Sequence, residues 1–403
     1  MKNVILITID CCRRDVFGCY GNQSKLAPFI DSLQDKCIIF TKTHSVGPYT
    51  KASFPGLLAS SYCLEYGWQQ NCAKEWVLVS EVLSKNGIAT AGFHSNPYLS
   101  AYFGWNRGWF VFMDSMKDKV TPEYPYLKGD VINKRIEKWI TFHTGGGGSY
   151  KPFFLWVHYM DIHEPYIPKR EFIDFVDASI QMDEKEMFAL YKNVLLKRDG
   201  SDLKTVNVLK RLYHAHVREA DGYVEQLFEI LRKLNLLDDT VIIITSDHGD
   251  EFGEHGSLSH DSTMYAELIH VPLMISEPGR KESIFFDTLV STADIPPTIT
   301  KLFDINPSEN WKGQSLLPTG AYQAGGVFCE APEKKGDAPP EVIQEVHCYR
   351  EADLKVIYHE KKESWEMFDL AVDPGELKNI VADSGDANRM KEKIMPRLRR
   401  AAK

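Results

Sequence analysis

Short apolar runs rich in β-branched residues alternate along the chain with stretches whose apolar residues follow a helical period. The strand-like runs are residues 4–9, 153–157 and 241–245, and the helix-like stretches are residues 27–37 and 206–234. This alternation predicts an α/β fold in which helices cover both faces of a central, mostly parallel sheet. Asp10 and Asp247 each follow such a strand, so we expect them to meet at the carboxyl edge of the sheet.

The pattern changes near the C-terminus to short strand-like runs joined by turns. These runs are residues 325–330, 345–349, 354–358 and 365–369, and a helix-like stretch covers residues 386–401. We therefore predict a large α/β domain of residues 1–321 and an antiparallel-sheet subdomain of residues 322–403 packed on it. The polar, proline-containing stretch 334–340 is expected to form an exposed loop.

A GGGGS run at residues 145–149 matches the flexible linkers that are used in engineered proteins. Such a run adds reach and flexibility and supplies no chemical groups. The sequence leaves open whether it is native or a replaced loop, and it carries no functional argument.

Composition and charge narrow the class of function. With 43% hydrophobic and 26% charged residues the chain has a globular composition, and its net charge of −9 argues against nucleic acid as a partner. No apolar stretch reaches the roughly 20 residues that a membrane helix needs, so no membrane partner is expected. The apolar start lacks the features of a signal peptide, and the eight cysteines show no disulfide framework. We therefore expect a cytoplasmic protein with reduced thiols.

The segment SDHGDEFGEHG, residues 246–256, carries the clearest chemical signal. A β-branched strand delivers Asp247 and His248 into a glycine-rich loop. A carboxylate beside an imidazole suits a divalent metal such as zinc or manganese. The alternative is a solvated polar loop after a core strand. Asp10 follows an independent strand in the same way, and a metal site requires such a third ligand.

Several motifs in order along the chain resemble the sulfatase branch of the alkaline phosphatase superfamily. They are NVILITIDCCRRDVFGCYG, APFIDSL, GPYTKASFPGLLAS, HSNPYL, FFLWVHYMDIHEPY, SDHGDEFGEHG, YAELIHVPL, STADIPPTI, WKGQSLLP and MFDLAVDPGELKNI. The resemblance implies a central sheet between helices and a smaller C-terminal sheet. It also implies hydrolysis of sulfate or phosphate esters at a bound divalent metal.

Carried over by position, Asp10 is similar to the first metal carboxylate of the family, and Asp247 and His248 match its late ligand pair. True sulfatases usually place a second acidic ligand where this chain has Cys11, and often an asparagine where it has His248. Calcium, which prefers several hard oxygens, is therefore less expected than zinc or manganese. Cys11 is either a soft ligand or a buried structural cysteine.

The nucleophile segment of the family places Thr50 where sulfatases have the cysteine or serine that becomes formylglycine. Threonine does not undergo that modification, and Ala52 and Phe54 replace the proline and arginine of the motif. Phosphodiesterases, nucleotide pyrophosphatases and phospho-head-group transferases of the superfamily use a threonine. Metal coordination of Thr50 Oγ1 would favour an alkoxide that attacks phosphorus. The alternative is that Thr50 only caps a helix.

Further residues are expected to contact the substrate. His163 matches a family histidine that binds the oxyanion or assists the leaving group, and His158 in the same segment is a second candidate. His260 stands where sulfatases place a lysine, and a histidine there can protonate the leaving alkoxide. Lys51 is expected to supply the positive charge of the missing arginine. Asn96 resembles a position that lines the pocket. Structural or solvated roles are the alternatives for each.

The sequence thus predicts a metal-dependent hydrolase that cleaves small anionic phosphate mono- or diesters through Thr50. One metal ion is expected. The alternatives are a sulfatase that works without formylglycine, a phospho-head-group transferase and a catalytically silent binding protein. The natural substrate and the oligomeric state are not encoded in any motif that we recognise.

Overall fold

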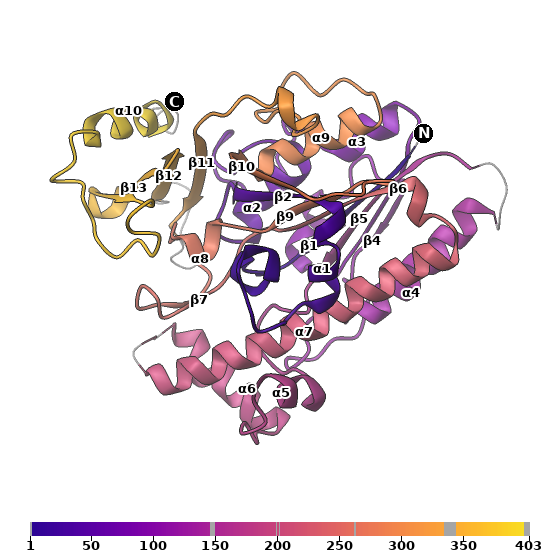
Figure 1. Ribbon diagram of the computed structural model, residues 1–403, viewed down its shortest axis with the longest axis horizontal. Coiled ribbons are helices and arrows are strands. Elements are labelled where there is room, and N and C mark those ends of the chain that lie inside the picture. The colour runs from indigo at the N-terminus through magenta and orange to yellow at the C-terminus, as the bar shows by residue number, and fades with distance from the viewer. Residues whose placement is uncertain are drawn as a thin grey trace.

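A computed structural model describes residues 2–145, 150–198, 200, 202–261, 263–333 and 344–398. Helices lie on both faces of an eight-stranded sheet, and a separate four-stranded sheet lies toward the C-terminus (Figure 1). The predicted fold class is confirmed. Most of the GGGGS run and the whole stretch 334–340 lie outside the described residues.

The main sheet is mostly parallel. Its strands are β1 (Asn3–Ile9), β2 (Cys37–His44), β3 (Ala89–His94), β4 (Val111–Met113), β5 (Phe153–Tyr159), β6 (Thr240–Ser246), β9 (Leu273–Ser276) and β10 (Ile284–Ser291). They lie in the order β10, β2, β9, β6, β1, β5, β3, β4. Strand β9 is antiparallel to β2 and β6, and the other neighbouring pairs are parallel. Strands β7 (Glu251–Phe252) and β8 (Leu258–Ser259) pair separately.

Helices cover the sheet because successive side chains of its strands point to opposite faces. Ile5 and Ile7 of β1 join one core with α4 and α7, whereas Val4 and Leu6 join a second core with α2, α3 and α9. The helices are α1 (Pro28–Ser32), α2 (Thr50–Ala59), α3 (Val79–Lys85), α4 (Gly129–Thr144), α5 (Arg170–Asp177), α6 (Glu184–Asn193), α7 (Leu203–Lys233), α8 (Ala266–Ile269), α9 (Ile295–Leu302) and α10 (Ala387–Leu398).

The helix expected over residues 27–37 is much shorter than predicted. Only α1 is helical, a 3₁₀ turn covers Gln34–Lys36, and Cys37 already begins β2. The apolar residues from Cys37 to Phe40 fill the sheet and not a helix face. The start of β2 at Cys37 therefore sets the latest point at which a helix from residue 27 could end.

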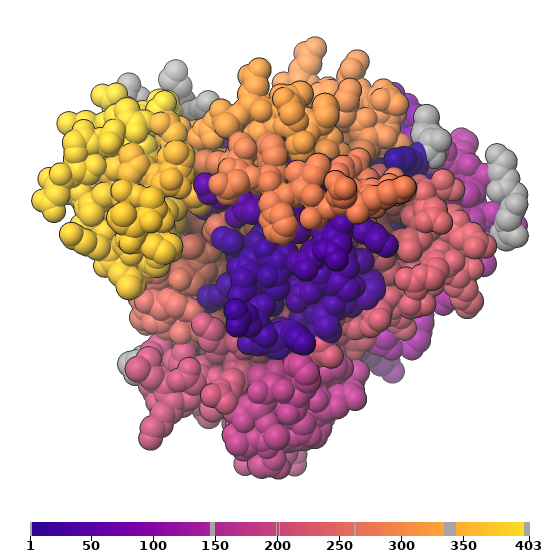
Figure 2. All heavy atoms as spheres, in the orientation of Figure 1, coloured from indigo at the N-terminus to yellow at the C-terminus, as the bar shows by residue number. Residues whose placement is uncertain are grey.

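The C-terminal subdomain follows the predicted pattern closely. Strands β11 (Val327–Pro332), β12 (Glu345–Glu351), β13 (Leu354–His359) and β14 (Ser364–Asp369) form an antiparallel sheet with α10 beside it. Figure 2 shows this segment as a lobe at one end of the molecule. One face of its sheet packs on the start of α2 and on α8. The domain boundary after residue 321 stays a prediction.

Two composition-based expectations concern the whole chain. All eight cysteines are free thiols, as predicted. Among the described residues, no helix is both long enough and apolar enough to cross a membrane.

Candidate active site

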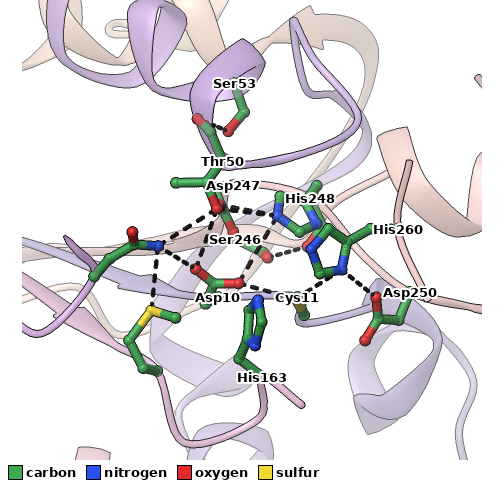
Figure 3. A network of polar contacts seen from close by, with 12 residues as sticks. Asp10, Cys11, Thr50, Ser53, His163, Ser246, Asp247, His248, Asp250 and His260 are labelled. Carbon is green, nitrogen blue, oxygen red and sulfur yellow. Dashed lines mark hydrogen bonds and ion pairs between the residues drawn. The ribbon is translucent and has the colours of Figure 1, made fainter. Parts of the chain in front are cut away.

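Four of the predicted residues meet at the carboxyl edge of the main sheet. Asp10 follows β1, Asp247 and His248 follow the neighbouring strand β6, and Thr50 is the first residue of α2. Thr50 Oγ1 lies 3.5 Å from both Asp10 Oδ2 and His248 Nε2. Figure 3 shows these side chains pointing toward one another. All four are buried.

His248 presents one ring nitrogen to this cluster. Its Nδ1 lies 2.9 Å from the carbonyl oxygen of Gly249, to which it donates its proton. Burial lowers the pKa of His248, so the ring is neutral and Nε2 keeps a free lone pair. Nε2 lies 3.3 Å from Asp247 Oδ2 and 3.8 Å from Asp10 Oδ1. A backbone carbonyl that fixes the tautomer in this way is typical of metal-binding histidines.

Asp247 shows that the cluster fits a cation. Its side chain is 0% exposed, and neither carboxylate oxygen has a hydrogen-bond partner among the described residues. Burial and the charge of Asp10 raise the pKa of Asp247 well above its usual value. Two carboxylates buried side by side are costly unless a positive charge compensates them. The set of Asp10, Thr50, Asp247 and His248 offers oxygen and nitrogen donors for such an ion.

Asp10 is held by three neighbours. His158 Nε2 lies 3.0 Å and Asn96 Nδ2 3.2 Å from Oδ2, and the Cys11 thiol donates to Oδ1 over 2.9 Å. Burial alone would raise the pKa of Asp10, but the hydrogen bond from His158 and the charge of His163 hold it well below its usual value. Asp10 is therefore a fixed, ionised carboxylate.

Asn96 combines both roles that the sequence left open. Its Nδ2 also lies 3.5 Å from Thr50 Oγ1, so it contacts the candidate nucleophile. Its Oδ1 accepts from the amide of Tyr98 over 3.0 Å, which caps a short 3₁₀ turn. The turn therefore aims the amide group into the site.

Cys11 is a thiol in this arrangement. Burial and the charge of Asp10 raise the pKa of Cys11 well above its usual value. Its backbone is left-handed, with φ of 57°, which turns the chain sharply after Asp10. Its Sγ lies 3.5 Å from His260 Nδ1. Cys11 therefore contacts both Asp10, a candidate metal ligand, and His260, the predicted general acid.

His260 is oriented by a carboxyl group that the sequence analysis did not single out. Its Nδ1 lies 2.8 Å from Asp250 Oδ1, and Tyr166 donates to Asp250 Oδ2 over 2.5 Å. Burial raises the pKa of Asp250 to about 6. The ring of His260 lies 4.6 Å from that of His248, measured between centroids. Asp250 stands three residues after Asp247 in the same motif, and that spacing was the available signal.

His163 joins the same side of the site. Its ring centroid lies 5.1 Å from that of His260, and its Nδ1 lies 2.8 Å from the carbonyl oxygen of Glu164. Although burial would lower it, the charges of Asp10 and Glu164 raise the pKa of His163. The structure thus brings His163 and His260, two of the three predicted substrate histidines, together.

Lys51 extends toward a different group of residues. Its ammonium group donates to Gln70 Oε1 over 2.6 Å and lies 4.2 Å from the ring centroid of Tyr98. The side chain thus leaves α2 beside Thr50 and reaches the aromatic segment after Asn96. Its expected role as a substrate-binding cation stays a prediction.

Comparisons with known proteins give the family and the fold of this chain. A model of the sulfatase family matches residues 2–305, and a model of the C-terminal part of N-sulphoglucosamine sulphohydrolase matches residues 253–403. Arylsulfatase K from Canis lupus familiaris is 30% identical over 434 residues, covering 94% of this chain and 78% of the relative. Choline-sulfatase from Rhizobium meliloti is 31% identical over 250 residues, or 58% of this chain and 47% of the relative.

Two further comparisons concern length and fold. The chain spans 34% of arylsulfatase K from Bos taurus and, as noted, about half of choline-sulfatase. The solved phosphonate monoester hydrolase of Agrobacterium radiobacter has a TM-score of 0.79 at 19% identity, covering 99% of this chain and 95% of that chain. This last likeness shows the fold.

The relatives also correct one prediction and identify the family. A Caenorhabditis elegans relative, the Sulf-1 homolog, is 29% identical over 62% of this chain and has a name that places it outside the cell. The predicted cytoplasmic location is therefore wrong, because it rested on an apolar start that forms β1 and carries no information on the compartment. The family model covers most of the chain, and the canine relative matches nearly all of it. The chain thus belongs to the sulfatase family, whose members are metal-dependent ester hydrolases.

Proposed function

We propose that the chain hydrolyses phosphate mono- or diesters with Thr50 as the nucleophile. The observation that carries this proposal is the position of Thr50 Oγ1, 3.5 Å from Asp10 and from His248 at the position where sulfatases carry the formylglycine precursor. A threonine hydroxyl is competent for nucleophilic catalysis when a cation or base activates it. The substrate is a small anionic ester.

The start of α2 favours attack on an anionic centre. Thr50 is its first residue, so its hydroxyl lies at the positive end of the helix dipole. The dipole stabilises negative charge near the N-terminus. It would act on the oxygens of a phosphoryl group that Thr50 attacks.

The donor set favours zinc or manganese over calcium. His248 offers a neutral imidazole nitrogen, and imidazole suits these metals, whereas calcium takes oxygen ligands. When bound by Asp10, Thr50, Asp247 and His248, such an ion lowers the pKa of the threonine hydroxyl and neutralises substrate charge.

The proposed reaction has two steps. Thr50 Oγ1 loses its proton to solvent and attacks phosphorus, and the bond to the leaving oxygen breaks while His260 protonates that oxygen. Water then attacks the phospho-threonine and gives a proton to His260, the bond from phosphorus to Thr50 Oγ1 breaks, and Oγ1 takes a proton back from solvent. Asp250 keeps the imidazole of His260 in place through both steps. His163 binds the oxyanion, and Lys51 would join it by leaving its contact with Gln70.

A sulfate ester is the second candidate substrate. The relatives named arylsulfatase K and choline-sulfatase favour it. The same residues would then act on sulfur, again without formylglycine. The two candidates differ in the atom attacked, and matched substrates separate them.

The experiment uses nitrophenyl phosphate, its phosphodiester, a phosphonate monoester and nitrophenyl sulfate. Each is offered to metal-stripped protein reloaded in turn with zinc, manganese or calcium, with bound metal measured in every sample. We expect turnover of a phosphorus ester, greatest with zinc or manganese. A preference for the sulfate would reject the phosphate proposal in favour of the second candidate, and calcium as the best metal would reject the proposed metal.

A further inference from the structure

His158 is buried, and the proposed reaction makes no use of its contacts. It lies in β5 with 0% exposure, and the parallel pairing of β5 with β1 places it opposite Thr8. Its ring packs edge-on against Phe54, with 5.0 Å between centroids. This position gives a substrate no access to the ring, so the expected contact of His158 with substrate does not fit the structure.

A continuous chain of hydrogen bonds runs from Trp156 through Thr8 and His158 to Asp10. Trp156 Nε1 donates to Thr8 Oγ1 over 3.0 Å, Thr8 Oγ1 lies 2.9 Å from His158 Nδ1, and His158 Nε2 lies 3.0 Å from Asp10 Oδ2. All three links are buried. They connect the core of the sheet to the first residue of the candidate metal cluster.

The chemistry of the two ends sets the direction of this chain. An indole nitrogen can only donate, and an ionised carboxylate can only accept. Nε2 of His158 must therefore carry a proton for Asp10. The single proton of the Thr8 hydroxyl then goes to Nδ1 at 2.9 Å in preference to the carbonyl oxygen of Val157 at 3.3 Å. In this direction of the chain Nδ1 accepts from Thr8 and Nε2 donates to Asp10.

We propose that Trp156, Thr8 and His158 form a relay that orients Asp10 for metal binding. His158 is a positioning residue, because it acts on the metal through a carboxylate and touches neither substrate nor reacting atoms. The inference rests on the proposed role of Asp10 as a ligand. Groups that orient metal ligands typically change affinity or activity by about 10- to 100-fold when they are removed.

Two other roles for His158 make different predictions. A purely structural role would affect folding and leave metal affinity unchanged. Direct ligation is the other role, since atoms of Asp10, His158 and Asp247 lie within 4.8 Å of one another. Direct ligation would require an unprotonated Nε2 and would not tolerate a side chain that offers only a donor there.

The test measures the dissociation constants of zinc and manganese by chelator competition, with thermal stability measured on the same samples. His158→Gln places an amide donor near the position of Nε2, and His158→Leu removes it. His94→Leu is the matched control, because His94 pairs with His158 across β3 and β5 and is also buried, and its ring has no side-chain hydrogen-bond partner among the described residues. We expect about 10- to 100-fold weaker binding for His158→Leu and changes within about threefold for His158→Gln and His94→Leu.

Variants of Thr8 keep the test decisive if His158→Leu does not fold. Thr8→Ser keeps the hydroxyl and should bind metal like the unmodified protein, whereas Thr8→Val removes it and should bind more weakly. In the metal-free protein, long-range ¹H–¹⁵N spectra of the His158 ring should show the proton on Nε2. A proton on Nδ1 alone would overturn the relay.

Each outcome separates this inference from the proposed function. Asp10→Ala should greatly weaken metal binding, and normal binding by that variant would mean that the proposed metal site itself has failed. If Asp10→Ala weakens binding but folded His158→Leu does not, only the relay is wrong. Equal losses in His158→Gln and His158→Leu would point to direct ligation and would also overturn the positioning role.

Discussion

At the scale of single residues, the candidate site holds Thr50 and His260 in different surroundings. Thr50 lies among buried carboxylates that favour a cation, whereas His260 lies one ring away and is held by Asp250. The raised pKa of Asp250, about 6, comes from burial, and Tyr166 shares this carboxyl group. The proposed nucleophile and the proposed proton donor therefore both adjoin His248, Thr50 through its hydroxyl and His260 through its ring.

His260→Ala should slow esters of poorly acidic alcohols by about 100- to 10,000-fold and activated aryl esters far less, because only a poor leaving group needs the proton. The measurement is kcat/KM across a series of leaving groups of increasing pKa. His255→Ala is the control from the same glycine-rich loop, since His255 stacks on Tyr265, 3.6 Å away between ring centroids. Equal losses for all esters would remove the acid role of His260.

At the scale of elements, strand ends decide where the chemistry lies, and this part was predictable. Asp10 and Asp247 stand directly after apolar runs that could only be buried strands, so their shared edge followed from sequence. The hydrogen-bond partners of Asp10 could not be predicted in the same way. His158 lies inside β5, and its hydrogen bond to Asp10 depends on strand order and register. Asn96 lies at the start of a turn after β3, and its side chain reaches the site because of the conformation of that turn.

The segment after β5 also carries a carboxyl group that should titrate unusually. Burial raises the pKa of Asp161 to about 7, and its Oδ2 has no hydrogen-bond partner among the described residues. In the unfolded chain this pKa is about 3.9. Between these values the folded protein holds a proton that the unfolded chain has lost, so the free energy of unfolding falls as pH rises through this window.

Asp161→Asn should remove that pH dependence. The variant is expected to be more stable than the unmodified protein near pH 8 and to lose most of this advantage near pH 4, where the folded protein is protonated at Asp161 and the unfolded chain is about half protonated. Urea denaturation at several pH values gives the free energies of unfolding. A stability difference that stays constant across this range would contradict the raised pKa.

At the scale of the whole molecule, the C-terminal subdomain is joined to the catalytic core by buried charge as well as by apolar packing. Lys355 of β13 forms an ion pair with Glu376, and both side chains are fully buried. Glu376 also accepts from the amide of Ala266 at the start of α8, over 2.6 Å. Sequence showed the strands of this subdomain but not this contact, because the partners are far apart along the chain.

Lys355→Met should lower the free energy of unfolding by about 3–5 kcal/mol, since it leaves Glu376 buried without its cation. Combining it with Glu376→Gln should recover much of that loss, because no charge then remains buried. Lys361→Met, on an exposed turn, is the control. Chemical denaturation measures these variants, the Glu376→Gln single variant and the unmodified protein, and additive losses in the double variant would show that the two side chains do not act as a pair.

The central claim is that Thr50 is the nucleophile, and its most direct test is to trap the covalent intermediate. The metal-loaded protein is mixed with a turned-over phosphorus ester, quenched in acid, digested and analysed by peptide mass spectrometry. We predict a phosphorylated Thr50, a phosphorylated serine in Thr50→Ser, and neither label nor turnover in Thr50→Ala, which should still bind metal. An unlabelled Thr50 together with an active Thr50→Ala would contradict the account.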